Sequence, residues 1–248
     1  MPARDTSWQG KPHNGLMTEL NGRVVLIAGA NGGLGKSVTS AFLAAGATVV
    51  GVARAIEESE FNHEKFTAMP ADLLSADAVK KLVNTTVERF GRIDAAIHLM
   101  GGFAGGALVD ETGDETFDRM LGMNLKSAFY VARSVLPVMR KSGYGRFLAV
   151  GSRTAVEPQP NVGAYSASKA ALVSLVQTIA LENKDVGITA NVILPGTIDT
   201  AANRAAMPGA DASKWILPEQ IAGLLVWLCS GSAVQITGAA IPIYGRQA

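Results

Sequence analysis

The fold of this chain is decided by the stretch Val24-Val25-Leu26-Ile27-Ala28-Gly29-Ala30-Asn31-Gly32-Gly33-Leu34-Gly35. Its first five residues are all apolar, which is typical of a short strand that is buried on both faces of a parallel sheet. Glycines then interrupt the run, and residues 36–45 continue with helical spacing. In a strand–loop–helix unit, glycines allow a tight turn, and the free N–H groups of the helix N-terminus attract an anion. The stretch therefore predicts a phosphate-binding turn in a βα repeat.

The rest of the chain repeats this alternation. Further strands are expected at 48–52, 66–69, 95–100, 146–150, 188–193 and 239–243, and helices at 76–90, 117–140, 165–183 and 218–230. Strands that alternate with helices of this length indicate a parallel sheet covered on both faces. We therefore predict an α/β protein with a single Rossmann-type, doubly wound parallel sheet in one domain at 18–248, preceded by a flexible tail at 1–17.

Composition excludes several functions. The 248 residues are 48% hydrophobic and 6% aromatic, and 22 basic against 21 acidic residues leave a net charge of +1. That balance indicates neither a nucleic-acid partner nor a membrane surface. No apolar stretch reaches the roughly 20 residues that a membrane span needs. The single Cys229 cannot form an internal disulfide and has apolar neighbours, so we expect a buried thiol in a reducing, cytoplasmic setting.

Tyr165 and Lys169 carry the strongest indication of chemistry. They stand four residues apart at the start of an apolar helical run, so both side chains project from one helix face. A neighbouring ammonium favours the phenolate and is expected to lower the pKa of Tyr165 toward neutrality. Such a phenol suits proton transfer in the interconversion of a carbonyl and an alcohol.

With these motifs the chain resembles the short-chain dehydrogenase/reductase family from about residue 20 to 245. Gly29, Gly33 and Gly35 match its three-glycine motif, and Tyr165 and Lys169 match its Tyr-x-x-x-Lys signature. Three further matches occur in the expected order: Asn124 in Met-Asn-Leu-Lys-Ser, Ser152 at 13 residues before the tyrosine, and the turn Pro195-Gly196-Thr197-Ile198.

The resemblance implies a catalytic group of Asn124, Ser152, Tyr165 and Lys169. Tyr165 would be the general acid/base, Ser152 would orient the substrate oxygen, and Lys169 would bind the nicotinamide ribose. Asn124 would hold a water that links Lys169 to solvent, unless it simply bonds a local carbonyl. Cofactor contacts are implied for Gly29, Asn31, Gly33, Leu34, Gly35, Arg54, Asp72, Leu73, Gly101, Tyr165, Lys169, Pro195, Gly196, Thr197 and Ile198.

The end of the second strand favours NADP(H) over NAD(H). A carboxylate there would accept hydrogen bonds from the ribose 2′-hydroxyl of NAD. This chain instead has Ala53 followed by Arg54, whose forked, permanently charged guanidinium matches a 2′-phosphate. The alternative is a solvated arginine that Glu57 and Glu58 partly neutralise.

Two segments depart from the family pattern. His98-Leu99-Met100-Gly101 replaces the usual Asn-Asn-Ala-Gly, and Ile243-Tyr244-Gly245-Arg246 replaces Val-Asp-Gly-Gly. We interpret His98 as a packed or locally bonded strand residue rather than as a catalytic group. His13 and His63 lack a cysteine or carboxylate cluster at ligand spacing, so no metal site is expected.

Substrate choice is expected to depend on segments 101–113 and 199–217, beyond the strand ends. The second could form a lid, in which Arg204 either binds an anionic substrate group or forms a surface ion pair. The first interpretation is an enzyme similar to 3-oxoacyl carrier-protein reductases, acting on a small carbonyl or alcohol.

Two other functions remain open at this point. Residues 194–215 also resemble dihydropteridine reductases of the same family, and a nucleotide-sensing regulator without catalysis is a third possibility. The apolar faces within 117–140 and 165–183, with the end at 236–243, resemble the segments through which the family forms homotetramers; a homodimer is the alternative.

Overall fold

The apolar run Val24–Ala28 forms β1, an interior strand of a parallel sheet that pairs with β2 on one side and β4 on the other. The structure is a computed structural model that describes residues 20–247; the tail expected at 1–17 and His13 lie outside the described residues. Seven strands pair in the order β3-β2-β1-β4-β5-β6-β7, and every pairing is parallel. The strands are β1 (Val24–Ala28), β2 (Thr48–Ala53), β3 (Phe66–Pro70), β4 (Ala95–His98), β5 (Gly145–Val150), β6 (Ile188–Pro195) and β7 (Ala240–Ile243). The predicted doubly wound parallel sheet is confirmed.

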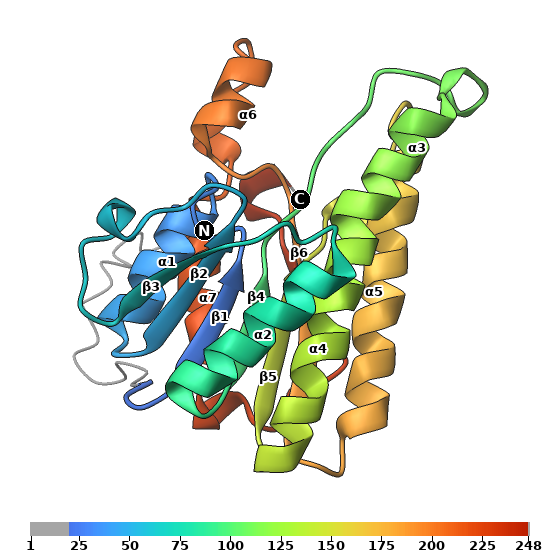
Figure 1. Cartoon of the computed structure of the whole chain (residues 1–248). Helices are drawn as coiled ribbons and strands as arrows, with labels where there is room; N and C mark the ends of the chain where they lie inside the picture. The colour runs from blue at the N-terminus through green and yellow to red at the C-terminus, as the bar shows by residue number, and fades with distance from the viewer. Residues whose placement is uncertain (1–19, 248) are drawn as a thin grey trace, which may run out of the picture.

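Helices cover both faces of this sheet (Figure 1). They are α1 (Gly35–Ala44), α2 (Ala76–Phe90), α3 (Asp114–Leu121), α4 (Ser127–Ser142), α5 (Gly163–Asn183), α6 (Ala201–Ala206) and α7 (Pro218–Leu228). One core cluster packs α2, α4 and α5 against one face, and a second packs α1 and α7 against the other. Because side chains alternate along a strand, Leu26 enters the first cluster while Val25 and Ile27 enter the second.

The long helix expected at 117–140 is the main correction. It begins earlier, at Asp114, since Asp114 and Glu115 lie favourably in the first turn of a helix. A π-helical turn at Gly122–Lys126 then separates α3 from α4. This turn contains Asn124, and π-helical turns are frequent at functional sites.

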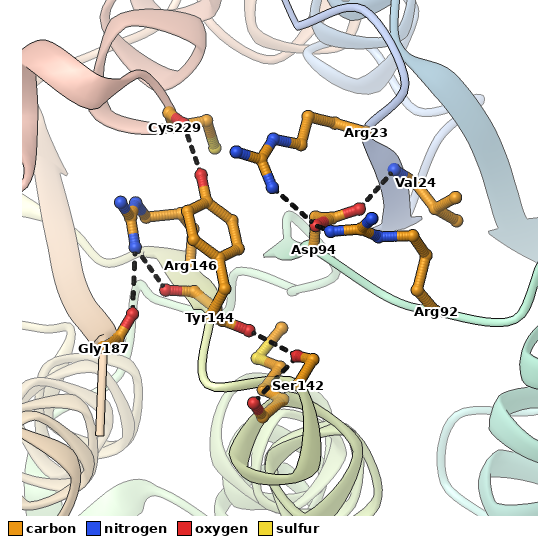
Figure 2. A network of polar contacts seen from close by, with 11 residues as sticks. Arg23, Val24, Arg92, Asp94, Ser142, Tyr144, Arg146, Gly187 and Cys229 are labelled. Atoms are coloured by element: carbon orange, nitrogen blue, oxygen red, sulfur yellow. Dashed lines mark hydrogen bonds and ion pairs between the residues drawn. The ribbon is translucent and has the colours of Figure 1, made fainter.

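A buried carboxylate anchors the amino ends of the strands, at the edge opposite the glycine turn (Figure 2). Asp94 is only 3% exposed and accepts hydrogen bonds from Arg23 at 3.0 Å and Arg92 at 2.5 Å. Its second oxygen accepts the backbone N–H of Val24 at 2.9 Å. Two cations and one amide therefore compensate the burial of this charge.

Tyr144 lies beside Asp94 in the same network (Figure 2). Its ring packs against the guanidinium groups of Arg23 and Arg146, at 4.0 and 4.3 Å from the ring centre. The Tyr144 hydroxyl donates to the backbone carbonyl of Cys229 at 3.2 Å. This arrangement links the ends of β1, β5 and α7.

Candidate active site

The predicted site residues gather at the carboxyl edge of the sheet. Gly29 follows β1, Ser152 follows β5 after one residue, and Pro195 ends β6. In open α/β sheets, ligands bind in the crevice outside this edge. The topology therefore brings together motifs that are more than 160 residues apart in the sequence.

Tyr165 lies in the first turn of α5 and is half-buried. Its hydroxyl shares a hydrogen bond with the Ser152 side chain, which also lies 3.0 Å from the Thr154 hydroxyl. The ring of Phe103 packs edge-on against Tyr165, with 5.0 Å between ring centres. Burial raises the pKa of Tyr165, and the Ser152 hydrogen bond opposes this only in part.

The expectation that Lys169 lowers the pKa of Tyr165 is wrong in this structure. Lys169 is buried, and its Nζ donates to the carbonyl of Val150 at 2.8 Å. Burial lowers the pKa of Lys169 itself from 10.5 to about 8. Its ammonium is thus directed to the end of β5, while Tyr165 is directed to Ser152.

Asn124 is fully buried within the π-helical turn. Its Oδ1 accepts the N–H of Gly102 at 2.9 Å, and its Nδ2 donates to the Gly102 carbonyl at 3.1 Å. Nδ2 also donates to the Ser168 hydroxyl at 2.9 Å. The local bond to a backbone carbonyl, left open by the sequence, is therefore present.

Ser168 is a site residue that the motifs did not single out. Its hydroxyl donates to the carbonyl of Tyr165 at 2.7 Å, which joins Asn124 to the first turn of α5. A buried serine directly before Lys169, in a helix with many apolar residues, was the available signal. Gly101 lies at the same point, because a Cβ there would come within 2.7 Å of Asn124 Oδ1 and 3.2 Å of Lys169 Nζ.

The glycine turn fits a dinucleotide. Gly29 has φ +88°, and a Cβ on Gly35 would lie 2.0 Å from the Gly29 carbonyl oxygen, so both positions require glycine. Among the residues that the structure describes, no side chain caps the N-terminus of α1, and no acidic residue stands in its first turn. Its N–H groups and the close backbone of Gly33 and Leu34 can therefore receive a pyrophosphate. A Cβ on Gly33 would lie 3.1 Å from Thr200, so the segment before α6 borders this turn.

The residues expected around the adenosine lie beyond β2 and β3. Asn31 donates to the Ala55 carbonyl at 2.6 Å and to Glu60 at 3.1 Å, which ties the glycine turn to the segment after β2. Arg54 is exposed, and within residues 20–247 it forms no ion pair with Glu57 or Glu58.

Asp72 and Leu73 follow β3. Asp72 is exposed and accepts the N–H of Leu74 at 3.0 Å, whereas Leu73 is buried. The Leu73 side chain packs in the core, so the part of it that a nucleotide could reach is the backbone.

The turn Pro195–Ile198 is held by two neighbours. Gly196 N donates to the carbonyl of Ile243, and Ile216 N donates to the carbonyl of Thr197, at 3.1 and 3.0 Å. Ile198 forms an isolated parallel bridge with Ile216. The chain then enters α6, where Arg204 forms a two-point ion pair with Asp199 at 2.5 and 2.7 Å. Of the two roles open for Arg204, the surface ion pair is the one present.

Both segments expected to select the substrate line cavities. One cavity of about 410 Å³ is lined by Phe103, Glu111, Arg119, Asn161 and Ala164, among others. A second, of about 510 Å³, lies beside α6 and is lined by Asp199, Arg204, Trp215 and Arg246, among others. Phe103 lies between the first cavity and the Tyr165 ring, which it contacts.

The remaining singled-out side chains, His98 and Cys229, are buried in the core of the protein. His98 is fully buried, its Nε2 lies 2.9 Å from the Ser127 hydroxyl, and burial lowers its pKa to about 3. A packed, locally bonded histidine is therefore confirmed. Cys229 is buried, and burial raises its pKa to about 12. Among the described residues, no three His, Cys, Asp or Glu side chains gather as metal ligands.

Comparison with known proteins agrees with this geometry. Residues 23–210 match the family model described as short chain dehydrogenase. The chain therefore belongs to the short-chain dehydrogenase/reductase family, and it is an oxidoreductase that acts on CH–OH or C=O groups. Within residues 20–247, no helix is both long and apolar enough to serve as a membrane span.

Relatives within the family carry different names. The chain is 30% identical over 241 residues to a 3-oxoacyl-[acyl-carrier-protein] reductase of Thermotoga maritima, covering 91% of this chain and 98% of the relative. It is 27% identical over 255 residues to a D-beta-hydroxybutyrate dehydrogenase of Rhizobium meliloti, covering 90% and 97%. The solved structure of ElxO with NADP bound shares the fold, with a TM-score of 0.85, 24% identity and coverage of 91% and 98%.

Proposed function

We propose that this protein reduces a ketone with NADPH, in the manner of the 3-oxoacyl-[acyl-carrier-protein] reductases. The hydrogen bond between Ser152 and Tyr165, beside buried Lys169, is the observation that carries the proposal. A relative with this reductase name covers almost the whole chain, which supports the same reaction class.

In the proposed mechanism each catalytic side chain has one task. A bound NADPH would supply the hydride that the carbonyl carbon accepts. Ser152 holds the carbonyl oxygen, and Tyr165 donates the proton that this oxygen takes up as the alcohol forms. Because burial keeps the pKa of Tyr165 above its ordinary value, the phenol stays protonated at neutral pH and is a ready donor. General acid help of this kind is typically worth about 10²–10⁴-fold in rate.

Lys169 and Asn124 complete the proposed catalytic group. Lys169 binds the ribose hydroxyls of the nucleotide from its place at the end of β5. Asn124 fixes Gly102 and, through the Ser168 hydroxyl, the start of α5. The glycine turn would hold the pyrophosphate of the nucleotide, and the segment Pro195–Ile198 would hold its nicotinamide end.

The preference for NADPH rests on Arg54. Its guanidinium is exposed at the end of β2, without an ion pair among the described residues, and can receive a 2′-phosphate. We expect Arg54→Ala to raise the KM for NADPH about tenfold or more and to leave the KM for NADH nearly unchanged. Equal effects on both nucleotides would contradict the assignment. Lys36→Ala, another exposed cation near the turn, is the matched control.

The experiment that tests the function is a nucleotide oxidation assay with 3-oxoacyl thioesters, other ketones, quinones and quinonoid dihydropterins. We expect ketone reduction by the wild type, its loss in Tyr165→Phe with NADPH binding retained, and no loss in Tyr130→Phe. Activity confined to pterins would favour the dihydropteridine reductase interpretation. Tight nucleotide binding without turnover of any substrate would favour a sensor.

Location and assembly are part of the proposal. A single buried thiol, Cys229, supports action in the reducing cytoplasm. Exposed apolar side chains on α4 and α5, Phe129 and Leu181, support a homotetramer or a homodimer. Light scattering of the purified protein would distinguish these two from a monomer.

A further inference from the structure

His98 occupies a position where the sequence departs from its family, and its hydrogen bond to Ser127 joins the end of β4 to the start of α4. The ring is fully buried at the end of β4, with Nε2 at 2.9 Å from the Ser127 hydroxyl. Within residues 20–247, the other ring nitrogen, Nδ1, has no hydrogen-bond partner. The bond to Ser127 is therefore the polar contact that fixes the ring. Its loss would leave both buried ring nitrogens unpaired, at a cost in stability.

Ser127 compensates for a defect that the π-helical turn creates. In that turn the Ser127 N–H bonds to the carbonyl of Gly122, five residues earlier. In a regular α-helix it would bond to the carbonyl of Met123, four residues earlier. The Met123 carbonyl therefore lacks this partner, and the Ser127 hydroxyl donates to it at 2.7 Å.

The direction of this bond sets the role of His98. A serine hydroxyl has one proton, and here that proton goes to the Met123 carbonyl. The Ser127 oxygen is then an acceptor, so His98 donates to it from a protonated Nε2. His98, Ser127 and Met123 thus form one buried chain of hydrogen bonds.

The π-helical turn aims Asn124 at the site. From the middle of the turn, Asn124 bonds both backbone groups of Gly102 and the hydroxyl of Ser168, which in turn donates to the carbonyl of Tyr165. A turn with regular α-helical register would rotate Asn124 away from these partners, since each inserted residue rotates the helix face by about 100°.

We propose that His98 is a positioning residue, which holds the π-helical turn in the register that directs Asn124 to Gly102 and Ser168. The kinetic part of this proposal rests on the ketone reduction proposed above; the structural part does not. His98 touches neither Tyr165 nor Lys169 in any hydrogen bond, and it acts through Ser127.

The test compares His98→Leu with His98→Gln, because the glutamine amide can still donate to Ser127. We expect His98→Leu and Ser127→Ala to lower kcat about tenfold while the Kd for NADPH changes by less than about threefold. Hydrogen exchange in residues 120–128 should become faster in both variants. His98→Gln should retain both the rate and the protection, which a loss of packing alone would not produce.

Thr178→Val is the matched control. Thr178 makes the same kind of hydroxyl bond to a carbonyl four residues earlier, that of Ser174, but on an exposed face of α5. It should change neither kcat nor the exchange of 120–128. If His98→Leu unfolds the protein, Ser127→Ala and His98→Gln still decide the question.

Three outcomes would overturn the proposal: unchanged exchange in Ser127→Ala and His98→Leu, a kcat loss without faster exchange, or equal damage by His98→Gln. The exchange measurement needs no substrate. If the wild type reduced no ketone while exchange followed the expected pattern, the proposed function would fail and the positioning role of His98 would stand.

Discussion

At the scale of single residues, burial moves the two central titratable groups of the site in opposite directions. Desolvation penalises whichever form is charged, so it raises the pKa of the Tyr165 phenol and lowers the pKa of the Lys169 ammonium to about 8. At neutral pH the phenol therefore keeps its proton and most of the ammonium keeps its charge, although the titration of Lys169 lies closer to neutrality than that of a free lysine.

This predicts a specific pH dependence. We expect kcat/KM for NADPH to be constant below pH 8 and to fall as pH rises through about 8, because Lys169 of the free enzyme then loses its charge. The steady-state profile between pH 6 and 10 is the measurement. A flat profile across pH 8 would show that the charge of Lys169 is not needed.

The titration of Lys169 also affects stability, which should rise over the pH range in which kcat/KM falls. Between pH 8 and 10.5 the unfolded chain holds a proton on Lys169 that the folded chain has released. The free energy of unfolding should therefore gain a positive contribution as pH rises through this window, by up to about 1.4 kcal/mol per pH unit for one proton. Denaturant unfolding of the wild type and of Lys169→Met would isolate it.

At the scale of elements, the glycine turn and the π-helical turn both depend on close backbone contact. Gly35 starts α1 directly beneath Gly29, where even a methyl group would overlap a carbonyl oxygen. Gly32, three residues earlier, leaves 3.4 Å between the same oxygen and an added Cβ. Position 35 therefore requires glycine, whereas position 32 leaves room for a Cβ.

We expect Gly35→Ala to destabilise the protein by about 3 kcal/mol and to abolish NADPH binding, because the turn must open to admit the methyl group. Gly32→Ala should change the free energy of unfolding by less than about 1 kcal/mol, since its Cβ meets ordinary van der Waals distances. Thermal unfolding and fluorescence titration with NADPH would measure both. Equal tolerance of the two substitutions would contradict the overlap at Gly35.

The elements that could be predicted from the sequence are those with a clear period. Continuous apolar runs such as Val24–Ala28 predicted all seven strands, and Ala76–Phe90 was predicted to the residue. The π-helical turn was not predicted, because an apolar pattern does not locate a single inserted residue within a long helical segment. In the structure it is revealed by the Ser127 N–H, which bonds to the Gly122 carbonyl, and by the Ser127 hydroxyl, which donates to the Met123 carbonyl.

The residues of the site could be predicted from the sequence, but the directions of their side chains could not. The family motifs placed Tyr165 and Ser152 in one catalytic group, and in the structure a Ser152 hydrogen bond acts on the pKa of Tyr165. The direction of Lys169 was not predictable, because its contact with Val150 depends on where β5 ends relative to α5. Sequence spacing relates side chains within one element, whereas the direction of Lys169 depends on both the helix α5 and the strand β5.

At the scale of the whole molecule, the two edges of the sheet have separate tasks. The carboxyl edge carries the site, and the amino edge carries the network around Asp94 and Tyr144 (Figure 2). Strands such as β1 and β4 span the distance between them. Stability and chemistry are therefore expected to respond to different substitutions.

We expect Asp94→Asn to lower the free energy of unfolding by about 3 kcal/mol, because it leaves Arg23 and Arg92 without their buried partner. The kcat of the folded fraction should not change. Urea unfolding and steady-state kinetics on one preparation would measure both. Asp211→Asn is the control, since the pair of Asp211 and Lys214 at 3.9 Å is exposed and should contribute little to stability. A large kcat loss in Asp94→Asn would show that the two edges are coupled.

The burial of Cys229 has a practical consequence. The chain contains one cysteine, and a thiol with a pKa of about 12 presents almost no thiolate to a maleimide at neutral pH. A cysteine introduced on the exposed helix α6, for example by Ala206→Cys, would accept a fluorophore at a single position of the wild-type background. The movements of that helix during turnover can thus be followed optically without first removing a native thiol.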